Sequence, residues 1–317
     1  MKMRAVSING ITPANEVCLT GVDIPKVKSG WVLVKVRAFG LNHSEQVLRL
    51  SEVNEDYIQK PVIPGIECVG EIEDPSDTDF EKGQKVVALM GGMGRSFNGS
   101  YAEYALLPAH HVFKVTSSLD WDRLAVVPET YFTAWGSLFE CLKLTKDDTL
   151  LVRGATCALG YVAIDIAKAL GCNVIATTHR ESKMDLIRSA DEQILDEGSI
   201  CDKVSGVTKV LELVGAKTLK DSLLSVKRGG IVCHTGILGG EFSLNGFSPI
   251  NDIPNGVYLT GFYSNYPSQE VMDEIFNFIE AKKIIPSYGA SYKFDDIREA
   301  CIAMDDSRVN GKIVIRM

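Results

Sequence analysis

The stretch VRGATCALG, residues 152–160, stands where an apolar strand-like segment gives way to the helical pattern YVAIDIAKALG. A strand, a tight turn and a helix in this order form the setting in which proteins bind a dinucleotide pyrophosphate, because the helix N-terminus presents free backbone N–H groups. The usual fingerprint, G-x-G-x-x-G, has three glycines. Here Gly160 matches the last, while Ala155 and Cys157 stand at the other two positions. Alone, the stretch fits either a dinucleotide loop built from small side chains or an ordinary β–α turn.

The segments that follow decide the fold class. Strand-like and helix-like segments alternate up to about residue 265: TLLVRG and LGYVAIDIAKALG, NVIATT and RESKMDLIRSA, KVLELVG and KTLKDSLLSVK, then GGIVCHTG. Repeated β–α units of this length predict a parallel sheet with helices on both faces, which is a doubly wound α/β domain.

The two ends of the chain read differently from this middle part. The first ~115 residues contain short apolar–polar runs such as WVLVKVRAFG (31–40), separated by glycine and proline turns. A helical pattern begins at about residue 119, and the last ~50 residues hold one amphipathic helix (269–283) and a final strand, KIVIRM. We therefore predict a β-rich domain, 1–118, completed by residues 266–317, and a doubly wound domain over 119–265.

Composition narrows the function classes. The chain has 317 residues, 41 Asp plus Glu against 33 Lys plus Arg, and a net charge of −8. This acidic balance argues against nucleic-acid or membrane-surface partners. No segment has the ~18 continuous apolar residues of a membrane span, and eight scattered cysteines form no C-x-x-C pair. We expect a soluble, cytoplasmic protein with reduced thiols.

The end of the second predicted strand indicates which dinucleotide would bind. Proteins that prefer NAD usually have Asp or Glu there to bind the ribose 2′-hydroxyl. This strand ends in Thr177 and Thr178 and is followed by His179, Arg180 and Lys183. That group suits the 2′-phosphate of NADPH, although a solvated helix start would look similar.

Several stretches together resemble the medium-chain dehydrogenase/reductase superfamily, in its zinc-independent, zeta-crystallin-like quinone oxidoreductase branch. The matching stretches are GLNHSEQVLRL (40–50), PVIPGIECVGEI (61–72), GGMGRSFNGSYAEYALLPAHHVFKV (91–115), VVPETYFTAWGSLF (126–139), LVRGATCALGYVAIDIAKALGCNVIATT (151–178), ELVGAKTLKDSL (212–223), RGGIVCHTGILGG (228–240) and NGKIVI (310–315). The resemblance implies a GroES-like β-rich catalytic domain, a Rossmann domain and bound NADPH.

The resemblance also implies which residues contact the cofactor. Asn42 matches an asparagine beside the nicotinamide, with Glu45 at the position of the family's aspartate, and Thr133 matches a threonine near the same ring. The remaining matches are the pyrophosphate loop, the adenosine-phosphate pocket, three turns and two C-terminal residues: Ala155, Cys157, Ala158 and Leu159; Thr178, His179, Arg180 and Lys183; Val214, Gly236, Ile237 and Leu238; Phe262, Tyr263 and Ser264; Asn310 and Lys312.

At the positions of the metal ligands, this sequence differs from the zinc-dependent members of the superfamily. Those enzymes have a cysteine after an early strand and a histidine in a G-H-E motif. Here Asn42, His43 and Ser44 offer no cysteine, and Ile66 replaces the histidine. Zinc needs three or four converging N, S or O ligands. We therefore predict no metal.

The resemblance favours an NADPH-dependent reductase that transfers hydride to a quinone or an α,β-unsaturated carbonyl compound. Tyr57, Tyr131 and Tyr263 are candidates to donate a proton or to form an aromatic wall. We take Tyr57 and Asn42 as the catalytic candidates. The alternative is an NADPH-binding redox sensor or partner protein with negligible turnover, because a fold does not guarantee chemistry. We expect a small-molecule substrate and a homodimer through segment 256–262.

Overall fold

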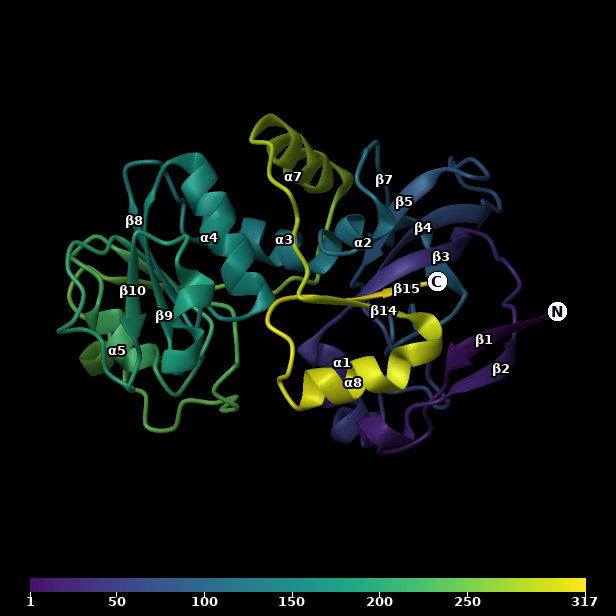
Figure 1. The fold of residues 1–317 in the computed structure, drawn as a ribbon, viewed down its shortest axis with the longest axis horizontal. Helices are drawn as coiled ribbons and strands as arrows, with labels where there is room; N and C mark the ends of the chain where they lie inside the picture. The colour runs from purple at the N-terminus through teal and green to yellow at the C-terminus, as the bar shows by residue number, and fades with distance from the viewer. The chain divides into compact units, whose positions relative to one another are not determined.

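The computed structural model describes all 317 residues and divides the chain into two compact units. Unit 1 consists of Met1–Phe132 and Asn265–Met317, and unit 2 of Thr133–Ser264. The chain therefore leaves the first unit, builds the second and returns to the first. Each unit is described by itself below (Figure 1).

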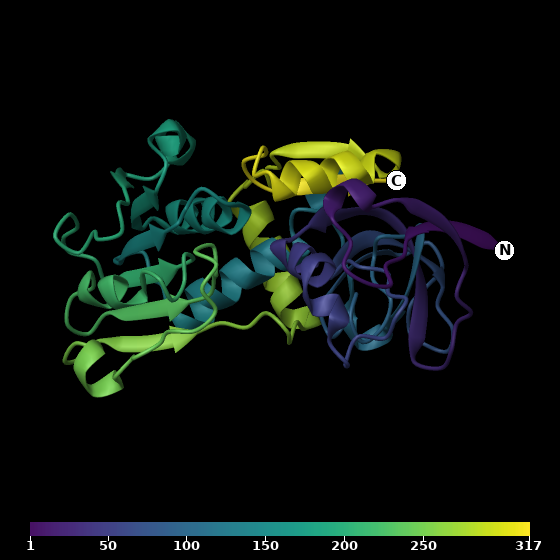
Figure 2. The same cartoon turned by 90° about the horizontal axis from the view of Figure 1, so that it is seen from below.

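Unit 2 is built on a six-stranded, all-parallel sheet in the order β10-β9-β8-β11-β12-β13. Figure 2 shows these strands in a stack whose colours run from teal to lime. The strands are β8 (Thr149–Arg153), β9 (Asn173–Thr178), β10 (Glu192–Leu195), β11 (Lys209–Glu212), β12 (Ile231–His234) and β13 (Tyr258–Gly261). The order reverses between β8 and β11, so the carboxyl ends of these two strands form the switch point at which doubly wound sheets bind ligands.

The helices of unit 2 are α4 (Ala158–Leu170), α5 (Leu219–Leu224) and α6 (Pro249–Asp252), and the π-helix η4 (Gly136–Cys141) precedes the sheet. Two expectations need correction. The helix expected in RESKMDLIRSA is the 3₁₀ helix η5 (Glu181–Ile187), and β10 was not predicted. Its sequence, EQIL, is too short to show a period.

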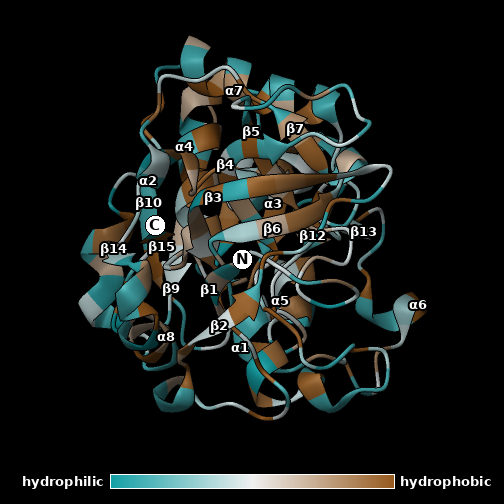
Figure 3. Cartoon of the chain, turned by 90° about the vertical axis from the view of Figure 1, so that its right-hand side faces the viewer, coloured by the Kyte–Doolittle hydropathy of each residue, from teal (hydrophilic) through white to brown (hydrophobic).

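Unit 1 contains a β-rich core. Strands β14-β15-β3-β4-β5-β7 form one sheet, β6 pairs with β3, and β1 pairs with β2. Figure 3 shows hydrophobic colour along most of β3, whose side chains are largely buried. The strands are β1 (Lys2–Val6), β2 (Leu19–Asp23), β3 (Trp31–Leu41), β4 (Glu67–Asp74), β5 (Lys85–Leu89), β6 (Tyr104–Pro108), β7 (Val112–Lys114), β14 (Ala290–Lys293) and β15 (Ile313–Arg316).

The C-terminal segment completes this unit. β15 pairs antiparallel with β3, although about 270 residues of chain separate Ile313 from Leu41. The helices of the unit are α1 (His43–Leu50), α2 (Trp121–Leu124), α7 (Gln269–Ala281) and α8 (Ile297–Asp305), with the short 3₁₀ turns η1 (Ala14–Glu16), η2 (Glu52–Asn54), η3 (Ala109–His111) and η6 (Phe294–Asp296). None of the helices in the structure combines the length and apolar character needed to cross a bilayer.

The first boundary differs from the prediction. The structure divides the chain within α3 (Pro128–Trp135), after Phe132 rather than after residue 118. The reason is that α2 belongs to the β-rich unit: Leu124 is buried, and the Asp122 carboxylate accepts a hydrogen bond from Ser291 at 2.8 Å.

Asp165 gives unit 2 a testable pH dependence. It lies in α4, and burial raises its pKa to about 6. Because the folded state disfavours the charged form, stability falls as pH rises from the unfolded pKa towards this value. Asp165→Asn should therefore raise the free energy of unfolding by about 1–3 kcal/mol at pH 8, since each unit of pKa shift is worth about 1.4 kcal/mol. Guanidinium denaturation measures this change.

Below pH 4 both states protonate Asp165, so the gain should vanish there. Exposed Asp147→Asn is the matched control and should change stability at neither pH. An equal gain at pH 4 and pH 8 from Asp165→Asn would contradict this account.

Candidate functional site

The loop between β8 and α4 has the backbone of a phosphate-binding turn. Gly154 has φ +80°, and a Cβ there would lie 2.9 Å from the Val214 side chain. At Gly160 a Cβ would lie 2.3 Å from the Ala155 carbonyl oxygen, so this glycine allows the helix to approach the strand closely. A glycine at position 155 is thus unnecessary for the turn, because Ala155 is not among the residues with positive φ.

Cys157 closes this turn as the N-cap of α4. Its Sγ accepts a hydrogen bond from the Gly160 N–H at 3.3 Å and lies 3.6 Å from the Gly154 carbonyl oxygen. Burial raises the pKa of the thiol, so it remains protonated at neutral pH. Ala158 and Leu159, in the first turn of the helix, carry backbone N–H groups at the positive end of its dipole. The loop fits a bound pyrophosphate.

Two further turns lie beside this loop. Leu238 and Gly239 donate backbone hydrogen bonds to the carbonyls of Leu213 and Val214, at 3.0 and 2.8 Å. Gly236 packs on Leu213, since a Cβ there would lie 2.3 Å from the Leu213 carbonyl oxygen. The structure therefore brings together the predicted residues Ala155, Cys157, Val214, Gly236, Ile237 and Leu238 at the carboxyl edge of the sheet.

The end of β9 presents a cluster of basic groups. Thr178 is buried, and its Oγ1 accepts a hydrogen bond from the Arg180 N–H at 3.3 Å. The Arg180 guanidinium donates to His179 Nε2 at 3.2 Å. Partial burial, followed by the charge of Arg180, lowers the pKa values of His179 and Lys183. Cations that lower each other's pKa would be stabilised by an anion between them.

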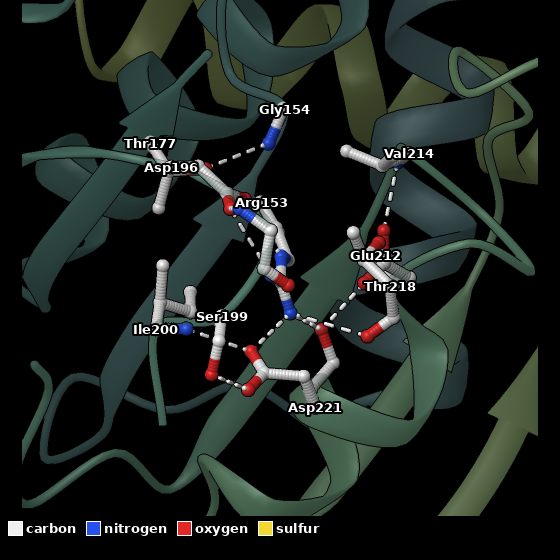
Figure 4. A network of polar contacts seen from close by, with 12 residues as sticks. Arg153, Gly154, Thr177, Asp196, Ser199, Ile200, Glu212, Val214, Thr218 and Asp221 are labelled. Carbon is white, nitrogen blue, oxygen red and sulfur yellow. Dashed lines mark hydrogen bonds and ion pairs between the residues drawn. The ribbon is translucent and has the colours of Figure 1, made fainter. Parts of the chain in front are cut away.

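A buried arginine precedes the loop. Arg153, fully buried at the end of β8, donates to Asp196 through Nε at 2.8 Å and to Asp221 through Nη1 at 2.7 Å. It also donates to the carbonyls of Thr218 and Gly198 (Figure 4). The guanidinium therefore connects the ends of β8 and β10 with the turn that starts α5.

Glu212, opposite Arg153 in the β8–β11 register, holds the next turn. Its carboxylate accepts hydrogen bonds from the N–H groups of Val214 and Gly215, at 2.7 and 3.0 Å, and from the Ser222 hydroxyl (Figure 4). Burial raises the pKa of Glu212, whereas these hydrogen bonds and Arg153 lower it. The carboxylate of Glu212, which lies just before the turn at 213–215, therefore holds that turn in place.

The sequence reasoning missed this network. The signal was present as Arg153 at the end of TLLVR and Glu212 inside KVLELV, which are charged residues in segments predicted to be buried strands. Charged side chains are almost never fully buried unless they are paired. Their positions required a partner, but the sequence does not identify it.

The residues predicted near the nicotinamide in unit 2 lie around η4 and β13. The Thr133 carbonyl accepts a hydrogen bond from the Ser137 hydroxyl at 2.7 Å, and Ser137 Oγ lies 2.9 Å from Thr235 Oγ1. The Phe262 ring packs against Gly136, whereas Tyr263 is exposed. Ser264 is the last residue of the unit.

In unit 1, Asn42 and Lys312 lie in one buried polar cluster. The Lys312 ammonium is 2.6 Å from Asn42 Oδ1 and 2.5 Å from Glu67 Oε1, and Asn42 Nδ2 donates to the same Glu67 oxygen at 2.9 Å. Glu45 accepts hydrogen bonds from the Asn42 and Ile66 N–H groups. Burial raises the pKa of Glu45. The side chains of Asn42 and Lys312 are thus engaged within the unit.

The other two predicted residues of unit 1 differ in exposure. Tyr57 is 61% exposed, and its hydroxyl donates to Glu52 at 2.9 Å. Burial of the group and its hydrogen bond to Glu52 raise the pKa of Tyr57, which makes it a weaker acid. Asn310 Oδ1 is buried without a hydrogen-bond partner in the structure, so a bound donor would satisfy it.

The donor set does not fit a catalytic zinc. Ile66 is apolar and buried, and the Glu67 carboxylate is bound by Lys312 and Asn42. No three His, Cys, Asp or Glu side chains in the structure are arranged to hold a metal ion. All eight cysteines are free thiols.

Two family models match the chain: the alcohol dehydrogenase GroES-like domain over residues 28–117 and the zinc-binding dehydrogenase over residues 189–315. An alcohol dehydrogenase of Geobacillus stearothermophilus is 27% identical, covering 99% of each chain. The human quinone oxidoreductase is 28% identical, covering 69% of this chain and 68% of its own. The structure of mycobacterial Rv1454c, solved in complex with NADPH, has a TM-score of 0.85 and 23% identity, covering 99% of this chain and 100% of its own. The two-domain alcohol dehydrogenase-like fold is confirmed.

Removal of the Arg153 charge should destabilise unit 2 strongly. In Arg153→Met, the carboxylates of Asp196 and Asp221 would remain without their cation in the protein interior. Breaking a buried pair in this way costs about 3–5 kcal/mol. The free energy of unfolding, from guanidinium denaturation followed by circular dichroism, measures the effect.

Lys203→Met is the control for this variant. Lys203 pairs with Glu197 on the surface of the same unit, where both side chains are exposed, so its removal should leave stability unchanged. Equal effects of the two substitutions would show that the buried network does not hold the turns.

Proposed function

Because the chain belongs to the medium-chain dehydrogenase/reductase superfamily, we propose that it is an NADPH-dependent reductase that transfers hydride to a quinone or an α,β-unsaturated carbonyl compound without a catalytic zinc. The observation that carries the proposal is the cluster of Thr178, His179, Arg180 and Lys183 at the end of β9. No carboxylate of β9 faces the position of the ribose hydroxyls, since the strand ends in two threonines.

The cluster favours NADPH over NADH for an electrostatic reason. A 2′-phosphate brings about two negative charges, and Arg180 and Lys183 can pair with it by charge-assisted hydrogen bonds. A bound phosphate would reverse the lowering of the pKa values of His179 and Lys183. NADH has a neutral hydroxyl at this position and gains nothing from the cations.

The substrate class follows from how negative charge would be stabilised. When bound, NADPH supplies the hydride. Without a Lewis acid, a simple alcohol or ketone is a poor substrate, because its oxygen charge has no strong partner. A quinone or enone spreads the charge over a conjugated system, and hydrogen-bond donors are sufficient to stabilise it. The apolar Ile66 and the absence of a cysteine at residues 42–44 support this choice, and so does the similarity to the human quinone oxidoreductase.

The roles of the chain's own residues follow from their positions. The loop at 154–160 would bind the pyrophosphate, and the turns at 213–215 and 236–238 would enclose the cofactor, because all three are fixed by backbone hydrogen bonds and by Glu212. Asn42 remains a proposed nicotinamide contact from the family resemblance, and its amide is held within unit 1 by Lys312 and Glu67. Tyr57 remains a proposed proton donor or wall residue.

We also propose a cytoplasmic homodimer. β13 is an edge strand, hydrogen-bonded on one side to β12, and Tyr258 is 61% exposed on it. An unpaired, partly apolar edge can extend a sheet across a two-fold axis. Sedimentation of the purified chain tests the dimer, and a monomer at micromolar concentration would refute it.

The first experiment follows NADPH and NADH oxidation by absorbance with 1,4-benzoquinone, a naphthoquinone, an α,β-unsaturated ketone and a simple ketone, with and without a metal chelator. We expect chelator-resistant turnover of the conjugated acceptors with NADPH. Zinc near one equivalent per chain and chelator-sensitive alcohol oxidation would instead indicate an alcohol dehydrogenase. Tight NADPH binding without oxidation by any acceptor would indicate a sensor.

The cation cluster gives a second test. The double substitution Arg180→Ala/Lys183→Ala should raise the NADPH dissociation constant by about tenfold or more, because two charge-assisted contacts are lost, each worth over 1 kcal/mol. The NADH constant should not change. Fluorescence titration measures both.

Arg188→Ala is the matched control, since Arg188 is exposed and follows the same 3₁₀ helix. It should alter neither constant. If the double substitution weakens NADH and NADPH binding equally, the cluster does not bind the 2′-phosphate, and the proposed preference fails even where turnover is observed.

A further inference from the structure

Two cysteines from distant parts of the sequence meet in unit 2. Cys141 is the last residue of the π-helix η4, and Cys233 lies in β12. The i→i+5 hydrogen bonding of a π-helix widens its turn, and such turns often occur at functional sites. Ninety-two positions of sequence (233 − 141) separate the two thiols.

Contacts from two turns of η4 place this helix against the ends of β12 and β13. Cys141 Sγ donates to the Gly261 carbonyl at 3.5 Å, and Gly261 directly follows Thr260, the register partner of Cys233. One turn earlier, Ser137 Oγ lies 2.9 Å from Thr235 Oγ1. Cys233 Sγ lies 3.4 Å from the same Thr235 hydroxyl. The neighbouring Cys141 thiol also raises the pKa of Cys233, which agrees with these contacts.

Their exposure differs in a way that suits sequential oxidation. Cys141 is partly exposed, whereas Cys233 is fully buried. Burial raises the pKa of the Cys233 thiol to about 12, so this thiol is a poor first nucleophile. The remaining cysteines include Cys18, exposed in unit 1, and Cys172, whose thiol donates to the Thr145 carbonyl.

We propose that Cys141 and Cys233 form an oxidisable thiol pair that closes to an intramolecular disulfide in the presence of a peroxide. The Cys141 sulfur attacks one peroxide oxygen, which forms a sulfenic acid and releases one water. The Cys233 sulfur then attacks the sulfenic sulfur, forms the S–S bond, loses its proton and releases the hydroxyl as a second water. Two thiols lose two electrons in total, and the peroxide gains them.

The disulfide would join η4 to the strand that ends beside the turn at 235–238. That turn is hydrogen-bonded to residues 213 and 214 at the proposed cofactor site. Closure would therefore fix an element next to this site without using any residue of the phosphate loop. The inference does not depend on the identity of the substrate or on turnover.

Peptide mapping tests the pair. The full-length protein is treated with hydrogen peroxide, blocked with iodoacetamide without reduction, digested and analysed by mass spectrometry. We expect a cross-linked species that joins the peptides carrying Cys141 and Cys233 in more than half of the molecules, and its loss on treatment with dithiothreitol. The cross-link should be absent from Cys141→Ser and Cys233→Ser.

In Cys233→Ser the sulfenic acid on Cys141 has no resolving thiol, so dimedone labelling of Cys141 should rise at least fivefold over the parent protein. Cys18→Ser is the matched control and should leave the cross-link unchanged. Circular dichroism of every variant before oxidation shows whether it is folded. The proposal is overturned if oxidised parent protein contains only sulfinic acid at Cys141, or disulfides between chains, with no 141–233 link.

Discussion

The carboxyl edge of the unit 2 sheet depends on one buried charge, the guanidinium of Arg153. A guanidinium removed from water is tolerated only when its donors are paired, and this one is paired with two carboxylates and two backbone carbonyls. These partners lie up to 68 positions away from Arg153 in the sequence. The phosphate loop starts at the next residue, Gly154, so the position of the loop follows from where the arginine is held. A phosphate-binding turn acts mainly through the positions of its backbone N–H groups, and the contacts of Arg153 fix those positions.

Unit 1 uses a comparable device. Lys312 pairs with Glu67 while Asn42 bridges the two, and Glu67 also accepts a hydrogen bond from the Glu129 N–H at 2.8 Å. A Cβ at Gly40 would clash with the Lys312 side chain, so β3 carries a glycine where the lysine passes. The return of the C-terminal segment to unit 1 completes this cluster, because Lys312, just before β15, neutralises the Glu67 carboxylate on β4. Asn42 and Lys312, which the family resemblance marks as cofactor contacts, have structural partners that the resemblance does not reveal.

The sequence predicts most of the fold because its signals are local. Buried strands such as TLLVRG and the helix in YVAIDIAKALG have a period that can be read within one segment, and the superfamily resemblance supplies their order. β10 is missed because four residues carry no period, and η5 is a 3₁₀ helix because RESKMDLIRSA offers no continuous apolar face. The boundary at Phe132 depends on the packing of α2, which is a tertiary contact. Arg153 and Glu212 are visible as charged residues in predicted buried strands, but no local signal identifies Asp196 and Asp221 as the partners of Arg153.

The loop VRGATCALG shows which of its own glycines the backbone requires. Gly154 has a positive φ, and Gly160 allows a Cα-to-carbonyl approach that any side chain would block. Between them, the residue at position 157 begins the helix, and there an N-cap acceptor is worth more than conformational freedom. Cys157 provides that acceptor through sulfur, and its raised pKa keeps it from adding a negative charge beside a pyrophosphate. A thiolate at this position would repel the ligand that the helix dipole attracts, and burial of the thiol disfavours that charge.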